Sequence, residues 1–110
     1  MDAELIKELN LLHEQVCDAL GSPIRLMIFY ALSQKSRYVS DLAAELNLPQ
    51  PTISRHLRVL RERGLVTAQR EGPAVYYALA DERVMQALEL MRTVLRERLR
   101  RQVEITGKSG

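Results

Sequence analysis

The sequence predicts a mainly α-helical domain with one β-hairpin, its elements arranged in the order α-α-α-α-β-β-α. Apolar residues recur at helical spacing near both ends of the chain. Two short helical patterns joined by a tight turn occupy residues 39–60. Two runs rich in β-branched and aromatic residues then flank a Gly-Pro turn, which is the pattern of a hairpin.

The chain has 110 residues, a length that suits one domain with one core. We expect this domain to occupy residues 1–105 and residues 106–110 to form a flexible polar tail. The longest apolar run, residues 26–32, is too short to span a bilayer, and the acidic N-terminal segment is unlike a signal peptide. A single cysteine fits a reducing cytosol, so a cytoplasmic protein without membrane contact is expected.

The first two helices are predicted from apolar spacing and capping residues. Ser22 and Pro23 suit the N-cap and the first position of the second helix. The apolar stripe of the first helix contains Leu5, Leu9, Leu12, Val16 and Leu20. The buried face of the second helix is expected to contain Ile24, Met27, Ile28, Ala31 and Leu32.

The third and fourth helices form the predicted helix-turn-helix of residues 39–60. Ser40 is expected to cap the third helix, and Asn47 to take the left-handed conformation that ends it. Pro51 suits the first turn of the fourth helix and no later position. The residues of the fourth helix that face the core are expected to be Ile53, Leu57 and Leu60.

Gly64 is expected to end the fourth helix, and strands are predicted over residues 65–70 and 75–79. A hairpin that directly follows the second helix of a helix-turn-helix is a wing, so the predicted fold class is a winged helix-turn-helix. Asp81 suits the N-cap of a last helix. The apolar stripe of this helix contains Val84, Leu88, Met91, Leu95 and Leu99.

Charge is unevenly distributed, although the net charge is only +2. Residues 1–21 hold one lysine against five acidic residues, a sum of −4, whereas residues 92–101 hold five arginines against one glutamate, a sum of +4. We therefore expect the first and last helices to pack on each other across the two-fold axis of a homodimer. Folding of both stripes onto their own protomer is the alternative. The expected interface contains Leu5, Leu9, Leu12, Val16, Leu88, Met91 and Leu95.

The outer face of the fourth helix is predicted to contact double-stranded DNA, because residues 50–70 also sum to +4, with five arginines against one glutamate. Gln50, Thr52 and Arg55 are expected to reach base edges, since glutamine suits adenine and arginine suits guanine. Ser54 and Arg58 are expected to contact phosphates. An ordinary solvated basic face is the alternative interpretation.

Three further residues belong to the predicted DNA surface. Arg70 and Gly72 lie near the tip of the hairpin, where they are within reach of the DNA backbone or minor groove. His56 lies between the core stripe and the open face of the fourth helix. Half-buried packing with a hydrogen bond is favoured for His56 over contact with a phosphate.

Two alternative functions are open at this point. His13 and Cys17 lie four residues apart, and two copies in a dimer would supply four ligands for a metal- or redox-responsive sensor. A free cysteine among leucines is more often a small hydrophobic residue, so no metal and no cofactor are expected. The second alternative is a winged-helix module that binds protein. No enzyme is expected, because the sequence has no Gly-rich phosphate loop and no nucleophile beside a plausible base.

Three segments follow one another in register: Ala19-Leu20-Gly21-Ser22-Pro23-Ile24-Arg25-Leu26, Leu48-Pro49-Gln50-Pro51-Thr52-Ile53-Ser54-Arg55-His56-Leu57-Arg58-Val59-Leu60-Arg61-Glu62-Arg63-Gly64-Leu65-Val66 and Val75-Tyr76-Tyr77-Ala78-Leu79. With these segments, residues 19–81 resemble the ArsR/SmtB family of bacterial winged-helix repressors. The resemblance implies a homodimer that binds an imperfect inverted repeat in DNA and is released by an effector.

The chain departs from the two familiar metal sites of that family. Where thiolate sensors have Cys-Val-Cys-Asp-Leu, this chain has Tyr38-Val39-Ser40-Asp41-Leu42. Where the last-helix zinc sensors have two carboxylates and two histidines, it has Asp81, Arg83, Val94 and Glu97. Two carboxylates without nitrogen ligands suit zinc poorly. The resemblance therefore implies a regulator that does not sense metal through either site, and its effector is unknown.

Overall fold

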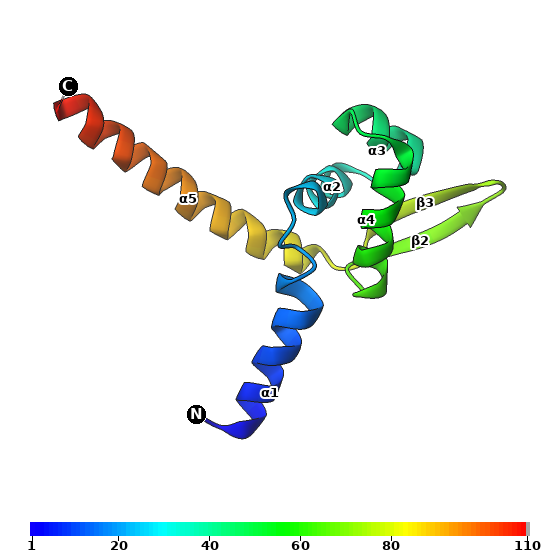
Figure 1. Ribbon diagram of the computed structural model, residues 1–110, viewed down its shortest axis with the longest axis horizontal. Coiled ribbons are helices and arrows are strands. Elements are labelled where there is room, and N and C mark those ends of the chain that lie inside the picture. Colours follow the sequence, from blue (N-terminus) through cyan, green and yellow to red (C-terminus); the bar gives the residue numbers. More distant parts are fainter. Residues whose placement is uncertain (110) are drawn as a thin grey trace.

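The computed structural model describes the backbone of residues 1–109 and the side chains of residues 1–104. Figure 1 shows α2, α3 and α4 together in the centre, the β2–β3 hairpin projecting from one side, and α1 and α5 projecting from the other. The elements in chain order are α1 Ala3–Leu12, the π-helical turn η1 His13–Cys17, α2 Pro23–Gln34, β1 Arg37–Tyr38, α3 Val39–Leu46, α4 Gln50–Glu62, β2 Val66–Glu71, β3 Ala74–Leu79 and α5 Glu82–Ser109.

The fold class is confirmed, because a helix-turn-helix, α3 and α4, is followed by a β-hairpin. The order differs from the prediction by one short strand, β1, which pairs with β3 to give an antiparallel sheet in the order β1-β3-β2. Tyr38 of β1 lies opposite Tyr76 of β3. A strand of two residues is too short to show alternation in the sequence, so only its pairing reveals it.

The first helix changes character at Leu12, where the α-helix passes into the π-helical turn η1. The extra residue in a π-turn rotates the residues after it about the helix axis. The predicted stripe is therefore divided: Leu9 is 44% exposed, whereas Val16 packs against the core and Leu20 is buried in it.

The core lies where α2 meets α3, α4, α5 and the sheet. Its largest fully buried side chains are Phe29, Ile28, Leu42, Ile53, Leu57 and Leu60. The prediction for the inner face of α4 is thus confirmed. For α2 one assignment was wrong: Met27 is 46% exposed, and Phe29, which the stripe omits, is fully buried. Because α2 is covered by several elements, its buried face is wider than a single stripe.

The helix ends match the predicted chemistry with one correction. Ser40 does not cap α3, because the Asp41 carboxylate accepts a hydrogen bond from the Tyr38 amide (3.2 Å) and the helix begins at Val39. Asn47 has φ 54° and ψ 49°, as expected at the end of α3. The Asp81 carboxylate accepts from the Arg83 amide (2.9 Å), which confirms it as a cap.

The strands are shifted by about one residue from the prediction and are joined by Gly72, at φ 60°, and Pro73. At the other end, α5 continues past residue 105 to Ser109, so the backbone is helical where a tail was expected. Gly110 lies outside the described residues, and both the mobility of the tail and the domain limit at 105 stay predictions. Within residues 1–109, no helix has the length and hydropathy of a membrane span.

Asn47 offers a test of the turn between α3 and α4. The amide of Leu48 bonds to the Ala43 carbonyl (3.0 Å), which closes the end of α3 while Asn47 stays left-handed. Asn47→Ala is expected to lower the free energy of unfolding by about 1 kcal/mol, because a side chain beyond Asn or Gly is strained in this region. Asn47→Gly should stay within about 0.5 kcal/mol of the parent. Urea denaturation followed by circular dichroism measures both, and equal stability of the alanine variant would contradict this explanation of the turn.

Candidate nucleic-acid interface

The face of α4 opposite its buried stripe is polar and basic. Gln50, Ser54, Arg55 and Arg58 are exposed on it, while Thr52 is half-buried. Three of the other residues of α4 point into the core, so the helical period separates the two sets cleanly. The predicted placement of these residues on an open face is therefore observed, and their contact with DNA is untested.

The hairpin lies beside this face and extends well past the body of the protein (Figure 1). A hollow of about 370 Å³ lies between the N-terminal part of α4 and the hairpin. Gln50 and Ser54 line it on the helix side, and Pro73 and Val75 line it on the hairpin side. The structure thus brings Gln50 and Ser54 to the hairpin, whereas Arg55 and Arg58 do not line this hollow.

Arg70 and Gly72 are exposed on the outer part of the hairpin, as predicted. Arg70 lies opposite Val75 in the β2–β3 register, one pair before the turn. Arg58 forms an ion pair within α4, since its Nε lies 3.1 Å from Oε1 of Glu62. The side chains of this pair are 78% and 61% exposed, so it contributes little to stability.

Tyr38 is connected to the hairpin by contacts that no local sequence pattern indicates. Its hydroxyl donates a hydrogen bond to the Glu71 carboxylate (2.6 Å), and this bond is the main cause that raises the pKa of Tyr38. Its ring lies 5.0 Å from the ring of Tyr76. Tyr38 therefore joins the start of α3 to both strands of the wing.

Residues 22–68 match the sequence model of a family described as "bacterial regulatory protein, arsR family". The chain is also 40% identical over 78 residues to the HTH-type transcriptional regulator MJ1325 of Methanocaldococcus jannaschii, and the match spans 70% of this chain and 88% of that protein. This chain belongs to the ArsR family.

Two other relatives agree with this assignment. The HTH-type transcriptional repressor SmtB of Mycobacterium tuberculosis is 43% identical over 63 residues, which are 57% of this chain and 47% of that one. The solution structure of the homodimeric winged helix-turn-helix DNA-binding domain of Mb0332 from Mycobacterium bovis has a TM-score of 0.78 and 32% identity. That similarity covers 90% of this chain and 91% of the other.

The terminal helices of this ArsR-family chain present apolar side chains to solvent. No residue of α1 is buried, and on α5 Met91 is 59% exposed. Of the residues predicted for a dimer interface, Leu5, Leu9, Leu12, Met91 and Leu95 are exposed, whereas Val16 and Leu88 pack partly against the core. Each of these helices exposes several neighbouring apolar side chains and not single scattered ones. Such a contiguous apolar surface is typical of an interaction site.

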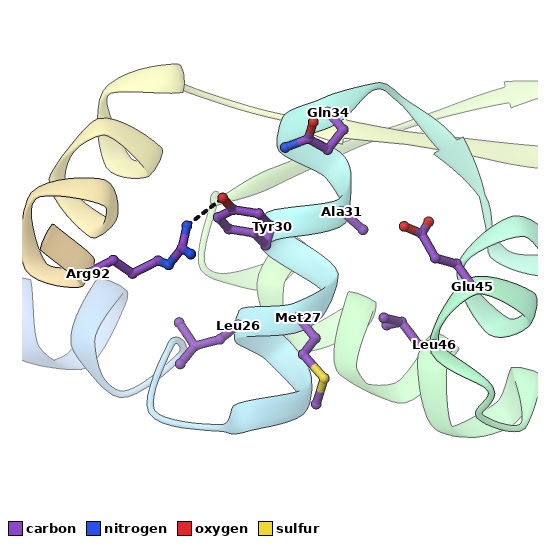
Figure 2. Close-up of a pocket in the computed structure, with 8 residues that line it drawn as sticks. All are labelled: Leu26, Met27, Tyr30, Ala31, Gln34, Glu45, Leu46 and Arg92. Atoms are coloured by element: carbon purple, nitrogen blue, oxygen red, sulfur yellow. Dashed lines mark hydrogen bonds between the residues drawn. The ribbon is translucent and has the colours of Figure 1, made fainter. Parts of the chain in front are cut away.

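A hollow of about 480 Å³ lies between α2, α3 and α5 (Figure 2). The Arg92 guanidinium of α5 donates a hydrogen bond to the Tyr30 hydroxyl and another to the Glu89 carboxylate (2.8 Å). Its central carbon lies 4.8 Å from the centre of the Tyr30 ring. Figure 2 shows Leu26 of α2 on the side toward α5, whereas Met27 points toward Leu46 of α3.

At the positions of the two familiar ArsR metal sites, Tyr38 and Arg83 bind other protein groups. Arg83 binds the Asp81 carboxylate (2.7 Å), and this hydrogen bond lowers the pKa of Asp81 to about 2. His13 and Cys17 mark the two ends of η1, and both are exposed. Among the described residues, no three His, Cys, Asp or Glu side chains are grouped to hold a metal ion.

His56 is half-buried beside the basic face, as predicted, but the expected hydrogen bond is not formed at its buried Nδ1. That atom has no hydrogen-bond partner among the residues that the structure describes. Burial, followed by the charges of Arg25 and Arg55, lowers the pKa of His56. The imidazole is therefore neutral at pH 7, and a nearby phosphate would favour its charged form.

His56 should make folding stability depend on pH. Below the ordinary histidine pKa of about 6.5, His56 binds a proton in the unfolded chain more readily than in the native protein. The free energy of unfolding should therefore rise as the pH increases from 5 toward 7, and His56→Gln should remove that rise. The exposed His13 supplies the control, since His13→Gln should keep the slope. Urea titrations at several pH values measure it, and equal slopes for the parent and His56→Gln would contradict the prediction.

Proposed function

We propose that this ArsR-family chain is a homodimeric, sequence-specific DNA-binding transcriptional regulator, a repressor that binds an inverted-repeat operator. The observation that carries the proposal is the polar and basic face of α4, which lies opposite the core stripe and beside the wing. Such a helix has the width that the major groove of DNA admits. The printed names of SmtB, a repressor, and of the Mb0332 domain, a homodimeric DNA-binding domain, support the proposal.

Three narrower statements belong to the proposal. The chain works as a binding protein in the cytoplasm and not as an enzyme, as expected of a family of regulators. It does not respond to metal through the two familiar family sites, because Tyr38 and Arg83 stand at ligand positions and bind Glu71 and Asp81. The homodimer is formed by the exposed apolar faces of α1 and α5, whose opposite charges favour their pairing.

The DNA contacts can be sorted by mutation. A duplex is first selected from a random library by the full wild-type chain, and its affinity is measured by fluorescence anisotropy at several salt concentrations. Arg55→Ala should cost about 1–3 kcal/mol on the selected duplex and relax preference at particular base pairs. Arg58→Ala should weaken all duplexes alike and lower the salt slope by about 1 for each protomer.

The wild-type protein sets the reference for this experiment. With roughly 6–10 phosphate contacts in the dimer, its affinity should fall by about 10³ to 10⁵ between 50 and 200 mM salt. Binding that is insensitive to salt would count against a DNA-binding function. If both variants only scale the affinity for every duplex, the sorting of Arg55 and Arg58 into base and phosphate contacts is wrong.

The dimer interface is tested on α1. Leu9→Glu places a charge on the predicted stripe and should weaken the dimer by at least about tenfold, because a buried charge without a partner is costly. Leu11 lies on the other side of the same helix and is also exposed, so Leu11→Glu is the matched control and should keep the dimer. Sedimentation equilibrium measures both variants. Equal association of Leu9→Glu and the parent would remove α1 from the interface.

A further inference from the structure

The joint between α1 and the body of the protein is the π-helical turn η1. Within it, the amide of Asp18 bonds to the carbonyl of His13 (2.7 Å), five residues back. In an α-helix the same amide would bond to Glu14, four residues back. The π-turn therefore releases the Glu14 carbonyl from its usual helical partner, at the point where the chain leaves the projecting helix.

Arg63 takes up the released carbonyl. It is the cap residue directly after α4, and its Nη1 donates a hydrogen bond to the Glu14 carbonyl. Its Nη2 donates to the Asp18 carboxylate (3.1 Å). The side chain of Arg63 is only 27% exposed, so the guanidinium is seated against η1 instead of extending into solvent.

A second arginine fixes the neighbouring turn. Nε of Arg25, at the start of α2, donates to the Ala19 carbonyl, and Nη2 of Arg25 lies 3.5 Å from the Asp18 carbonyl. The Ala19 side chain itself is fully buried. The segment from Glu14 to Ala19 is thus held by both α2 and α4, and the direction in which α1 projects depends on these contacts.

We propose that Arg63 is a positioning residue for operator recognition, which fixes the angle between α1 and α4 and thereby the spacing of the two α4 helices in the dimer. This inference rests on the proposed function, in which α1 forms the dimer and α4 contacts DNA. In a two-fold dimer, half-sites lie about one turn of DNA apart, so a change in this angle changes the spacing that fits.

The geometry favours arginine and separates this role from DNA contact. The guanidinium is a planar fork that reaches two acceptors at once, whereas the ammonium of lysine is a single point of charge. Arg63 lies about 20 Å from the N-terminal end of α4 along the helix axis, given a rise of about 1.5 Å per residue. An effect of Arg63 on the choice of DNA is therefore indirect.

The experiment compares DNA duplexes that differ only in the spacing between half-sites. The probes are the inverted repeat selected by the wild-type full chain, the same half-sites with one or two central base pairs added or removed, and a duplex with one half-site. The wild type should lose at least about tenfold in affinity when the spacing changes by one base pair. Arg63→Met should bind the selected repeat about tenfold more weakly, because the angle between α1 and α4 is no longer fixed before binding, and its affinities for all spacings should lie within about threefold.

We call the two bonds from Arg63 to Glu14 and Asp18 the clamp. Control variants distinguish the effect of losing the clamp from the effects of losing a positive charge or folding stability. Arg61→Met removes the same charge from the last turn of α4 and should keep the spacing preference of the wild type. Arg63→Lys and Asp18→Asn each leave part of the clamp and should give intermediate preferences, so they decide the question if Arg63→Met does not fold. Binding to the single half-site should change by less than about threefold in every folded variant.

The outcomes distinguish the inference from the function on which it rests. If the folded Arg63 variants keep the full spacing preference of the wild type, the positioning role is refuted while the DNA-binding function stands. If Arg61→Met broadens the preference as much as Arg63→Met, net charge and not the clamp is responsible. If the wild type selects no duplex and binds no half-site, the proposed function itself fails.

Discussion

The burial of one face of α4 is the constraint on which the rest of the structure depends. Ile53, Leu57 and Leu60 are fully buried against the surrounding helices and sheet. Removing one such side chain typically costs several kcal/mol, so α4 cannot rotate about its axis without a similar loss. The opposite face, with Arg55 and Arg58, is therefore presented outward in one fixed orientation. The core thus decides which residues of α4 lie on its exposed face.

The same core leaves the apolar side chains of α1 and of the outer part of α5 exposed. The radius of gyration is 17.3 Å, compared with roughly 13 Å for a compact domain of this length. The difference comes from α1 and α5, which extend away from the body (Figure 1). A projecting helix can place a partner accurately only if its base is rigid. The π-turn with Arg63 and Arg25 supplies that rigidity, because it connects the base of α1 to the ends of two core helices.

Local patterns predict much of this molecule, and long-range contacts account for the features they miss. The exposed face of α4 follows from the helical period, and the left-handed Asn47 and Gly64 follow from the steric freedom of Asn and Gly. The bond from Tyr38 to Glu71 joins residues 33 apart in sequence, and that from Arg63 to Glu14 joins residues 49 apart. No periodicity encodes such pairs. The π-turn was missed for a different reason: its apolar residues keep helical spacing, so the sequence shows one continuous helix.

Metal-sensing relatives are expected to hold metal ligands at the positions of Tyr38 and Arg83, and in this chain both residues form side-chain bonds instead. A bound metal ion links the segments that coordinate it and is lost when its ligands are protonated or the ion is removed. Here Tyr38 links the start of α3 to the wing through Glu71, and Arg83 links to Asp81 at the start of α5. Both links are made by protein side chains alone. The joint between α1 and α4 is built in the same way, because Arg63 binds Glu14 and Asp18 while Arg25 binds Ala19. In both places the connection between elements is made by side chains of the protein itself.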